Sequence, residues 1–167
     1  AFVTAPYNYY FKNINTDGLT VKSMEAAGGI IGRLEIHNGT DYKVCYGFDD
    51  CTIKDTTCIA SADVGGIIAS FQNPYNVTFN DCDINGLKLE GKGIYRFTYN
   101  NRDTLSFPSA GGYIGRGIAN NSKTIIINGG SINGIDIKST GHSGGLIGQT
   151  ECSVTMNAEG DTFVGDN

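Results

Sequence analysis

The sequence predicts an all-β fold, a right-handed parallel β-solenoid (β-helix) of about four turns with one loop insertion, in a single domain over residues 1–167. Gly is common at 24 residues, Pro is rare at 3 and Trp is absent, which is typical of short strands joined by tight turns. A Gly-Gly pair followed by apolar residues recurs four times, and two further elements precede each pair in constant order. Three elements in a fixed order indicate an internal repeat.

Each copy of the repeat opens with a strand-like run around one large apolar residue, for example Tyr75-Asn76-Val77-Thr78-Phe79. Five residues later comes a second element, clearest at 84–89 (Ile-Asn-Gly-Leu-Lys-Leu) and matched at 132–137 (Ile-Asn-Gly-Ile-Asp-Ile). Weaker versions occupy 16–21 and 53–58. These alignments predict three rows of equivalent residues: Phe11, Phe48, Phe79 and Ile127; Leu19, Thr56, Leu87 and Ile135; Val21, Cys58, Leu89 and Ile137.

The Gly-Gly pairs close each copy, and they start at Gly28, Gly65, Gly111 and Gly144. In three copies the pair begins seven residues after the second element, whereas the third copy needs 22 residues. The difference predicts a 15-residue insertion at approximately 93–107. The repeats then run approximately over 9–32, 46–69, 77–115 and 125–148. The paired glycines predict a sharp bend or the close approach of another segment.

A single copy has about three short strands and cannot bury its own apolar face. Stacking places each strand beside its equivalent in the next copy, at a spacing of about 4.8 Å. The equivalent side chains then form ladders inside the coil. Parallel connections of this kind are normally right-handed, which gives the predicted hand.

Charge and hydropathy argue against two classes of partner, nucleic acids and membranes. The net charge is −5 and the pI is about 4.8, with no dense cluster of Lys or Arg. This argues against a nucleic-acid partner, which needs a basic footprint. The apolar runs are only a few residues long, so we expect no membrane insertion. Because the sequence begins at Ala1 without a signal peptide, we interpret it as a mature or excised segment.

Cysteines and sequons favour an oxidising, extracellular compartment. Cys51 and Cys82 occupy the same repeat position on adjacent copies, so a disulfide between them is geometrically reasonable. Cys45 with Cys58 is a weaker pairing, and buried free thiols are the alternative reading for all of them. Sequons at Asn38, Asn76 and Asn120 predict glycosylation. No CxxC pair occurs and the chain has two His, so no zinc site is expected, nor any cofactor.

One known repeat class shares this pattern. Cys51-Thr52-Ile53 followed by Gly65-Gly66-Ile67-Ile68, and Ser131-Ile132 followed by 144–148 (Gly-Gly-Leu-Ile-Gly), resemble the GLUG-type repeats of secreted and surface proteins. The resemblance covers roughly residues 11–150. Such repeats occur in bacterial adhesins and in large extracellular proteins of protists. The resemblance therefore implies a stacked β architecture and a surface location, and it fixes no ligand.

An enzymatic alternative rests on short fragments that resemble motifs of pectin hydrolases built on β-helices: 15–18 (Asn-Thr-Asp-Gly), Asp49-Asp50 and 141–143 (Gly-His-Ser). A glycosidase needs two carboxylates facing one bond, which Asp17 with Asp49 or Asp50 could supply. His142 lies 92 residues after Asp50, about three turns along a stack, so we expect no catalytic site.

The expected function is an extracellular structural or adhesive module, and a subunit of a surface filament such as a flagellar hair or surface fibre is one form that it could take. Its partners would be copies of itself or neighbouring repeats, stacked end to end, because a solenoid end without a cap exposes unpaired strand edges. A carbohydrate-binding module is the main alternative. Inserted loops often carry binding, so the candidate contact residues are those of the insertion: Tyr95, Arg96, Phe97, Tyr99 and Arg102. A loop that packs over one face of the coil explains them equally well.

Overall fold

A computed structural model describes residues 7–35, 44–99, 102–118 and 123–157, and every regular element within them is a β-strand. The first copy holds β1 (Tyr7–Lys12), β2 (Asn15–Asp17), β3 (Thr20–Ser23), β4 (Ala27–Gly28) and β5 (Ile31–Glu35). The second holds β6 (Val44–Asp49), β7 (Thr52–Lys54), β8 (Thr57–Ala60), β9 (Val64–Gly65) and β10 (Ile68–Gln72). The third holds β11 (Asn76–Asn80), β12 (Asp83–Gly91), β13 (Tyr95–Tyr99), β14 (Arg102–Ser106), β15 (Ser109–Gly111) and β16 (Ile114–Ile118). The fourth holds β17 (Thr124–Asn128), β18 (Ser131–Ser139), β19 (His142–Gly144) and β20 (Ile147–Thr150), and β21 (Ser153–Asn157) follows it.

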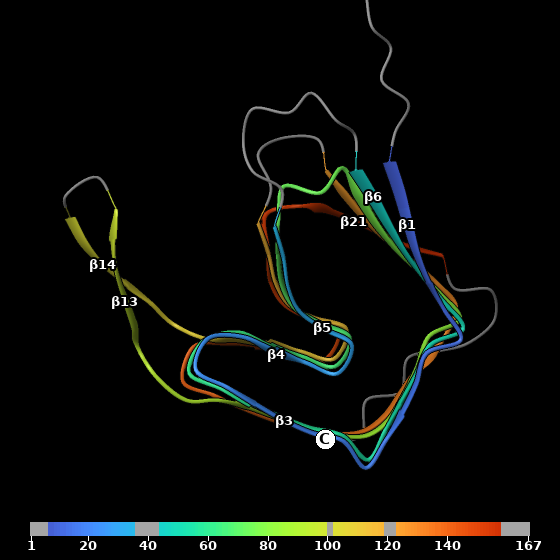
Figure 1. Ribbon diagram of the computed structural model, residues 1–167, viewed down its shortest axis with the longest axis horizontal. Helices are drawn as coiled ribbons and strands as arrows, with labels where there is room; N and C mark the ends of the chain where they lie inside the picture. Colours follow the sequence, from blue (N-terminus) through green and yellow to red (C-terminus); the bar gives the residue numbers. More distant parts are fainter. Residues whose placement is uncertain (1–6, 36–43, 100–101, 119–122, 158–167) are drawn as a thin grey trace, which may run out of the picture.

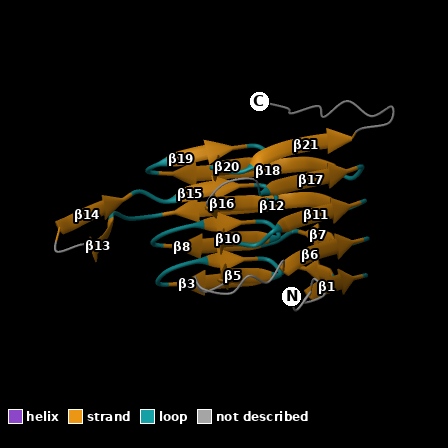
Figure 2. Cartoon of the chain, turned by 90° about the horizontal axis from the view of Figure 1, so that it is seen from above, coloured by secondary structure: helices purple, strands orange, loops and turns teal. Residues whose placement is uncertain are grey.

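Equivalent strands of successive copies pair in parallel and build four sheets that run along the stack (Figures 1 and 2). The orders are β1-β6-β11-β17-β21, β5-β10-β16-β20 and β4-β9-β15-β19, while β12 bridges β7 and β8 on one side and pairs with β18 on the other. The fold is therefore all-β with parallel sheets, an arrangement that fits the β-solenoid class.

The register confirms the predicted rows of equivalent residues. Phe11, Phe48, Phe79 and Ile127 are direct partners along one sheet. The Phe11 and Phe48 rings stack at 4.9 Å between centroids, and the Phe48 and Phe79 rings at 5.2 Å. Phe48 and Phe79 are fully buried, so this row forms part of the core.

The third copy adapts the core to two smaller residues. In the fourth copy, Ile127 takes the position that Phe79 has in the third. Gly130 likewise takes the position of Cys82, because the next residues, Asp83 and Ser131, are paired. The ring of Tyr113 occupies this space, 5.2 Å from the Phe79 ring, and its hydroxyl donates to the Cys82 carbonyl at 2.5 Å. A side chain at position 130 would collide with both groups, because an added Cβ there would meet the Cys82 backbone and the Tyr113 hydroxyl.

The Gly-Gly pairs lie where copies approach most closely, as predicted. A Cβ on Gly65 would collide with the carbonyl of Ile68 in its own copy, and one on Gly66 with the carbonyl of Gly112 in the next. The pair at 28–29 shows the same two contacts. Only a residue without a side chain fits these corners, because each faces backbone, which cannot turn aside.

Two other corners depend on left-handed backbone. The first places Asn13, Asp50, Asp81 and Gly129 at φ values between 49° and 66°, and the second places Gly18, Asp55, Gly86 and Gly134 between 44° and 68°. Each set is one residue per copy, in register. Asn, Asp and Gly tolerate this conformation best, which explains why these residue types recur there.

The predicted insertion contains an antiparallel hairpin. Strands β13 and β14 pair from Tyr95 with Ser106 to Tyr99 with Arg102. The hairpin projects sideways from the stack between β12 and β15 (Figure 2).

Candidate functional site

A groove on the side of the stack is the best candidate for a binding site. It lies between the sheet of β5, β10 and β16 and the segments that lead into β4 and β9, and it has a volume of about 400 Å³. Ser106, at the end of β14, also lines it, so the root of the hairpin borders the groove. Pockets of this size accommodate small ligands.

The groove owes its depth to a row of outward-facing residues. Strand register aligns Arg33, Ser70, Arg116 and Gln149, one per copy. Ser70 is by far the shortest of the four, and it lies between the two arginines. The missing side-chain volume at this position leaves a hollow between two guanidinium groups, while the small Ala26 and Ala62 line the opposite wall.

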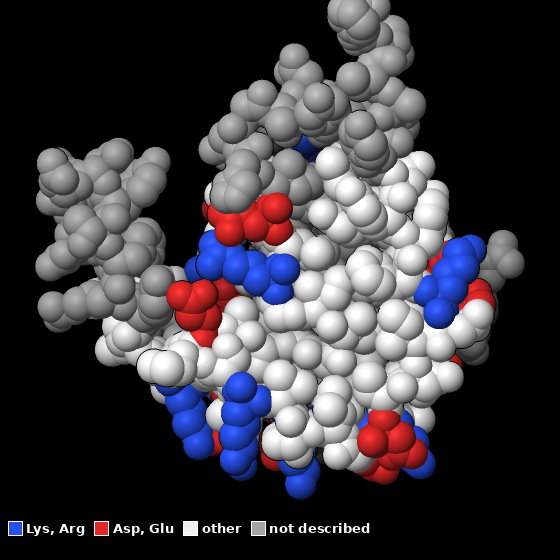
Figure 3. Space-filling view, viewed as in Figure 1, with Lys and Arg blue, Asp and Glu red and all other residues white. Residues whose placement is uncertain are grey.

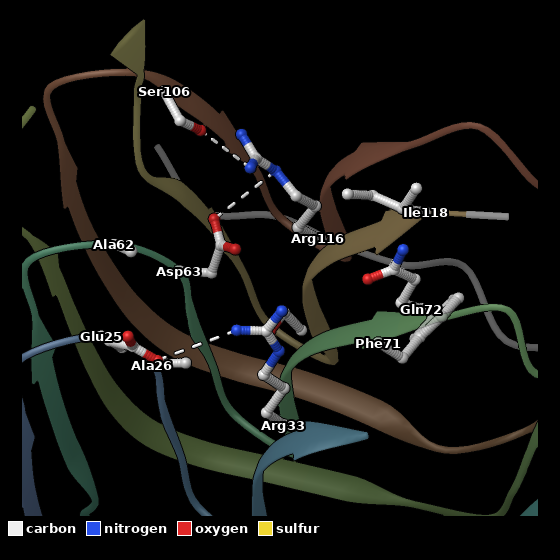
Figure 4. A pocket seen from close by; sticks show the side chains of 11 residues that line it. Glu25, Ala26, Arg33, Ala62, Asp63, Phe71, Gln72, Ser106, Arg116 and Ile118 are labelled. Atoms are coloured by element: carbon white, nitrogen blue, oxygen red, sulfur yellow. Dashed lines mark hydrogen bonds and ion pairs between the residues drawn. The ribbon is translucent and has the colours of Figure 1, made fainter. Parts of the chain in front are cut away.

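Asp63 lies on the wall opposite this row, between Arg33 and Arg116 (Figure 4). Its Oδ1 accepts a hydrogen bond from the Ser109 amide at 3.0 Å and lies 3.6 Å from Nε of Arg116. Burial raises the pKa of Asp63, and the positive charges of Arg116 and Arg33 together with the Ser109 amide oppose that rise only in part. The carboxyl group therefore holds its proton to a higher pH than an exposed aspartate.

Arg116 fastens the hairpin root to the stack. Its guanidinium donates to Gln149 Oε1 at 3.1 Å, to Ser106 Oγ at 2.9 Å and to the Phe107 carbonyl at 3.0 Å. Arg33, in contrast, forms ion pairs with Glu25 at 3.8 Å and Glu35 at 3.4 Å, and half of its side chain is exposed. The groove thus holds one fixed guanidinium and one with donors to spare.

The predicted contact residues of the insertion are partly placed. Tyr95, Arg96, Phe97 and Tyr99 belong to β13 and Arg102 to β14, so their backbone forms the hairpin. Their side chains lie outside the described part of the structure, and their role in contacts stays a prediction.

The five cysteines are all free thiols. Cys51 and Cys82 do lie at equivalent positions on adjacent copies, and both are fully buried, which is the alternative that the sequence left open. Their sulfurs donate to backbone carbonyls, Cys51 to Phe11 at 3.5 Å and Cys82 to Phe48 at 3.4 Å. Burial raises the pKa of Cys82 to about 12, which disfavours the thiolate that oxidation requires.

The weaker pairing, Cys45 with Cys58, is not formed either, and the two residues belong to different sheets. Cys45 lies in β6, in register with Asn8 and Asn76, whereas Cys58 lies in β8 between Val21 and Leu89. Burial also raises the pKa of Cys58 to about 12. The two thiols are therefore not at paired positions of neighbouring strands, where a bridge between copies could form.

Of the three sequons, Asn76 lies at the start of β11 and is half-buried. Asn38 and Asn120 lie outside the described residues. Glycosylation at all three sites stays a prediction.

The fragments that resemble hydrolase motifs do not converge. Asp17, in β2, binds Lys54 at 3.2 Å, and Asp49, in β6, binds Lys12 at 3.0 Å. His142 lies in β19, in the sheet of the Gly-Gly pairs. In the described part of the chain, no three His, Cys, Asp or Glu side chains gather as metal ligands.

The groove residues Arg33, Asp63 and Arg116 were not among the predicted site residues. A signal was present, because the residue directly after each Gly-Gly-x-x-Gly/Ala motif is Arg33, Ser70, Arg116 or Gln149. Aligning the copies one residue beyond the motif would have shown a polar row with one short member.

The chain has no match among models of protein families, curated proteins or solved structures. Across the described residues, no helix has the length and apolar character needed to cross a membrane.

Proposed function

We propose that this chain is a right-handed β-solenoid of about four turns that acts as an extracellular structural or adhesive module, and that it assembles end to end with another copy or with neighbouring repeats. A surface filament, such as a flagellar hair or a surface fibre, is the setting that suits such a module. The proposal is carried by one observation: both ends of the described stack leave apolar ladder residues uncovered.

At the first end, several inward-facing residues of the first copy are only half-buried, although their partners in the second copy are fully buried. This holds for Phe11 below Phe48 and for Val21 below Cys58. Figure 3 shows this end of the stack, with an uncharged centre and the Lys, Arg, Asp and Glu side chains around its rim. A centre depleted of charged side chains, with a polar rim around it, is typical of protein interfaces.

The opposite end has the same character. Ile135 and Ile137 of the fourth copy are half-buried, whereas Leu87 and Leu89 beneath them are buried. In addition, Met156 in β21 is 44% exposed. Uncovered ladder residues at both ends favour association, because burying them would remove apolar surface from water.

Strand edges add to the drive for assembly. Within the described residues, each of β1 to β5 pairs only with its equivalent in the second copy, which leaves one edge of every strand without a partner. Exposed edges of this kind act as templates for another strand.

A row of amides gives the assembly a direction. Asn157 donates to Asn128 at 2.8 Å, Asn128 to Asn80 at 2.7 Å, and Asn80 to Asp49, which also accepts from Lys12. Every amide donates toward the first copy. These bonds, the one from Asn80 first and then that from Lys12, lower the pKa of Asp49. A head-to-tail contact would continue the row, because it would bring the Lys12 ammonium of one molecule to the side-chain carbonyl of Asn157 in the next.

Sedimentation velocity and electron microscopy over a range of concentrations test the proposal. We expect particles that grow with concentration and, at high concentration, rows of solenoids. Met156→Lys should weaken this association, because it places a charge on an apolar end. Ile94→Lys is the matched control, since Ile94 is 59% exposed but lies beside the hairpin rather than at an end. Dispersed monomers at millimolar concentration, or equal effects of both substitutions, would defeat the proposal.

A further inference from the structure

The groove beside the hairpin carries an inference that is independent of end-to-end assembly. We infer that it is a subsite for one residue of an uncharged oligosaccharide. The hollow above Ser70, the donors of Arg33 and the acceptor Asp63 are the features that assign this ligand class.

The groove presents hydrogen-bonding groups that the fold itself does not use. In the described part of the chain, the Ser70 hydroxyl and the side-chain amide of Gln72 form no hydrogen bond with another residue. The ion pairs of Arg33, at 3.4 and 3.8 Å, are longer than the roughly 2.7–2.9 Å of a direct charge-assisted hydrogen bond. A ligand could therefore take these donors without breaking a strong bond.

Both donors and acceptors line the hollow. Arg33 and Arg116 donate, Asp63 and Glu25 accept, and Gln72 and Ser70 do both. A hydroxyl group is itself a donor and an acceptor, so a ligand with several adjacent hydroxyls can satisfy such a lining. The half-buried Ile118 supplies an apolar part of the wall, against which the C–H face of a sugar ring could lie.

The charge of the groove argues against an acidic ligand. Two guanidinium groups face two carboxyl groups, Asp63 and Glu25, so the formal charges of the lining balance. Glu35 adds a further negative charge beside Arg33. The chain as a whole carries −5, which repels polyanions at long range. A polyhydroxylated, uncharged ligand meets none of these penalties.

The position of the subsite also suits a chain-like ligand. The row from Arg33 to Gln149 runs along the stack, and its members are spaced by about 4.8 Å, the distance between paired strands. A polymer lying along the row would place one sugar in the hollow above Ser70 and its neighbours over Arg33 and Arg116. The hairpin root at Ser106 would border the ligand on its outer side.

Titration of the ¹⁵N-labelled full chain by NMR tests this inference. The probes are the hexasaccharides of a β-glucan, a xylan and a mannan, with hexagalacturonate as the acidic comparison. We expect saturable shifts of the Arg33 Nε–H and Gln72 side-chain amide signals with at least one uncharged probe. No saturable shift with any of the three at millimolar concentration would overturn the inference, as would tighter binding of hexagalacturonate.

Two substitutions locate the binding. Ser70→Tyr fills the hollow and should abolish the shifts, while Ile59→Tyr, on an outward position of β8 in the same copy, should leave the affinity unchanged. Arg33→Ser tests the donor without adding volume, and we expect affinity to fall by about tenfold, the range of a lost hydrogen bond to a charged group. Thermal unfolding of each variant shows that it is folded. Unaltered binding by Ser70→Tyr and Arg33→Ser would contradict the assignment.

Discussion

The phenylalanine row allows a quantitative test of stacking, because its members differ in how many neighbours they have. Phe79 is fully buried, with the ring of Phe48 on one side and that of Tyr113 on the other. Phe11 is half-buried and stacks only on Phe48. Replacing a fully buried Phe by Ala costs about 3–5 kcal/mol of unfolding free energy. Since Phe11 loses about half as much contact, Phe11→Ala should cost about 1–2.5 kcal/mol.

Urea unfolding followed by far-UV circular dichroism measures both free energies. If Phe79→Ala is too unstable to fold, Phe79→Leu and Phe11→Leu give the same ranking at a smaller cost. Repeat proteins gain stability from interfaces between neighbouring copies, so removing Phe79 weakens two interfaces while removing Phe11 weakens one. Equal losses for the two positions, or a loss below about 1 kcal/mol for Phe79→Ala, would refute the reasoning.

Three further predictions follow from single sites. Gly130→Ala should lower the free energy of unfolding by more than about 2 kcal/mol, because φ is 83° and the new Cβ meets the Cys82 carbonyl. Gly18→Ala, at φ 64° and with open space around the new Cβ, should lower it by about 1 kcal/mol. Equal losses in urea unfolding would contradict this. The folded-state pKa of Asp63 is raised, so its contribution to the free energy of unfolding is complete below the ordinary pKa of about 3.9 and is lost as the pH rises through the raised value. Asp63→Asn should therefore be more stable than the wild type above about pH 4 and equally stable below it. A stability difference that does not change with pH would rule this out. Native protein treated with iodoacetamide should be modified at the half-buried Cys45 long before Cys82, as peptide mass mapping would show, and prompt modification of Cys82 would indicate that its burial is wrong.

Much of the fold could be predicted from the sequence, because in a stacked repeat the spacing of similar residues determines which positions pair between copies. The row from Phe11 to Ile127 and the corners at the Gly-Gly pairs follow from alignment alone. The adaptation around Tyr113 could not be found this way. It is a compensation between positions that are distant in sequence, in which one large ring replaces volume lost at Ile127 and Gly130.

The groove was harder to predict than the core. Its hollow arises from a short side chain, Ser70, between two long ones, and this matters only once the copies are superposed in the correct register. The burial of Asp63 likewise depends on Arg116 and Ser109 in the next copy. Sequence patterns favoured the aromatic residues of the insertion because they are conspicuous, whereas the groove is made of ordinary polar residues brought together by stacking.

The most direct test of the account is a NOESY spectrum of the isotopically labelled chain. The stacked arrangement predicts contacts between backbone protons of residues that are in register on adjacent copies, such as Val77 with Tyr46 and Val77 with Ile125. These pairs are separated by 31 and 48 residues in the sequence. A spectrum whose inter-strand contacts join only residues close in sequence, as in a series of hairpins, would contradict the stacking of copies on which the fold, the end-to-end assembly and the groove all depend.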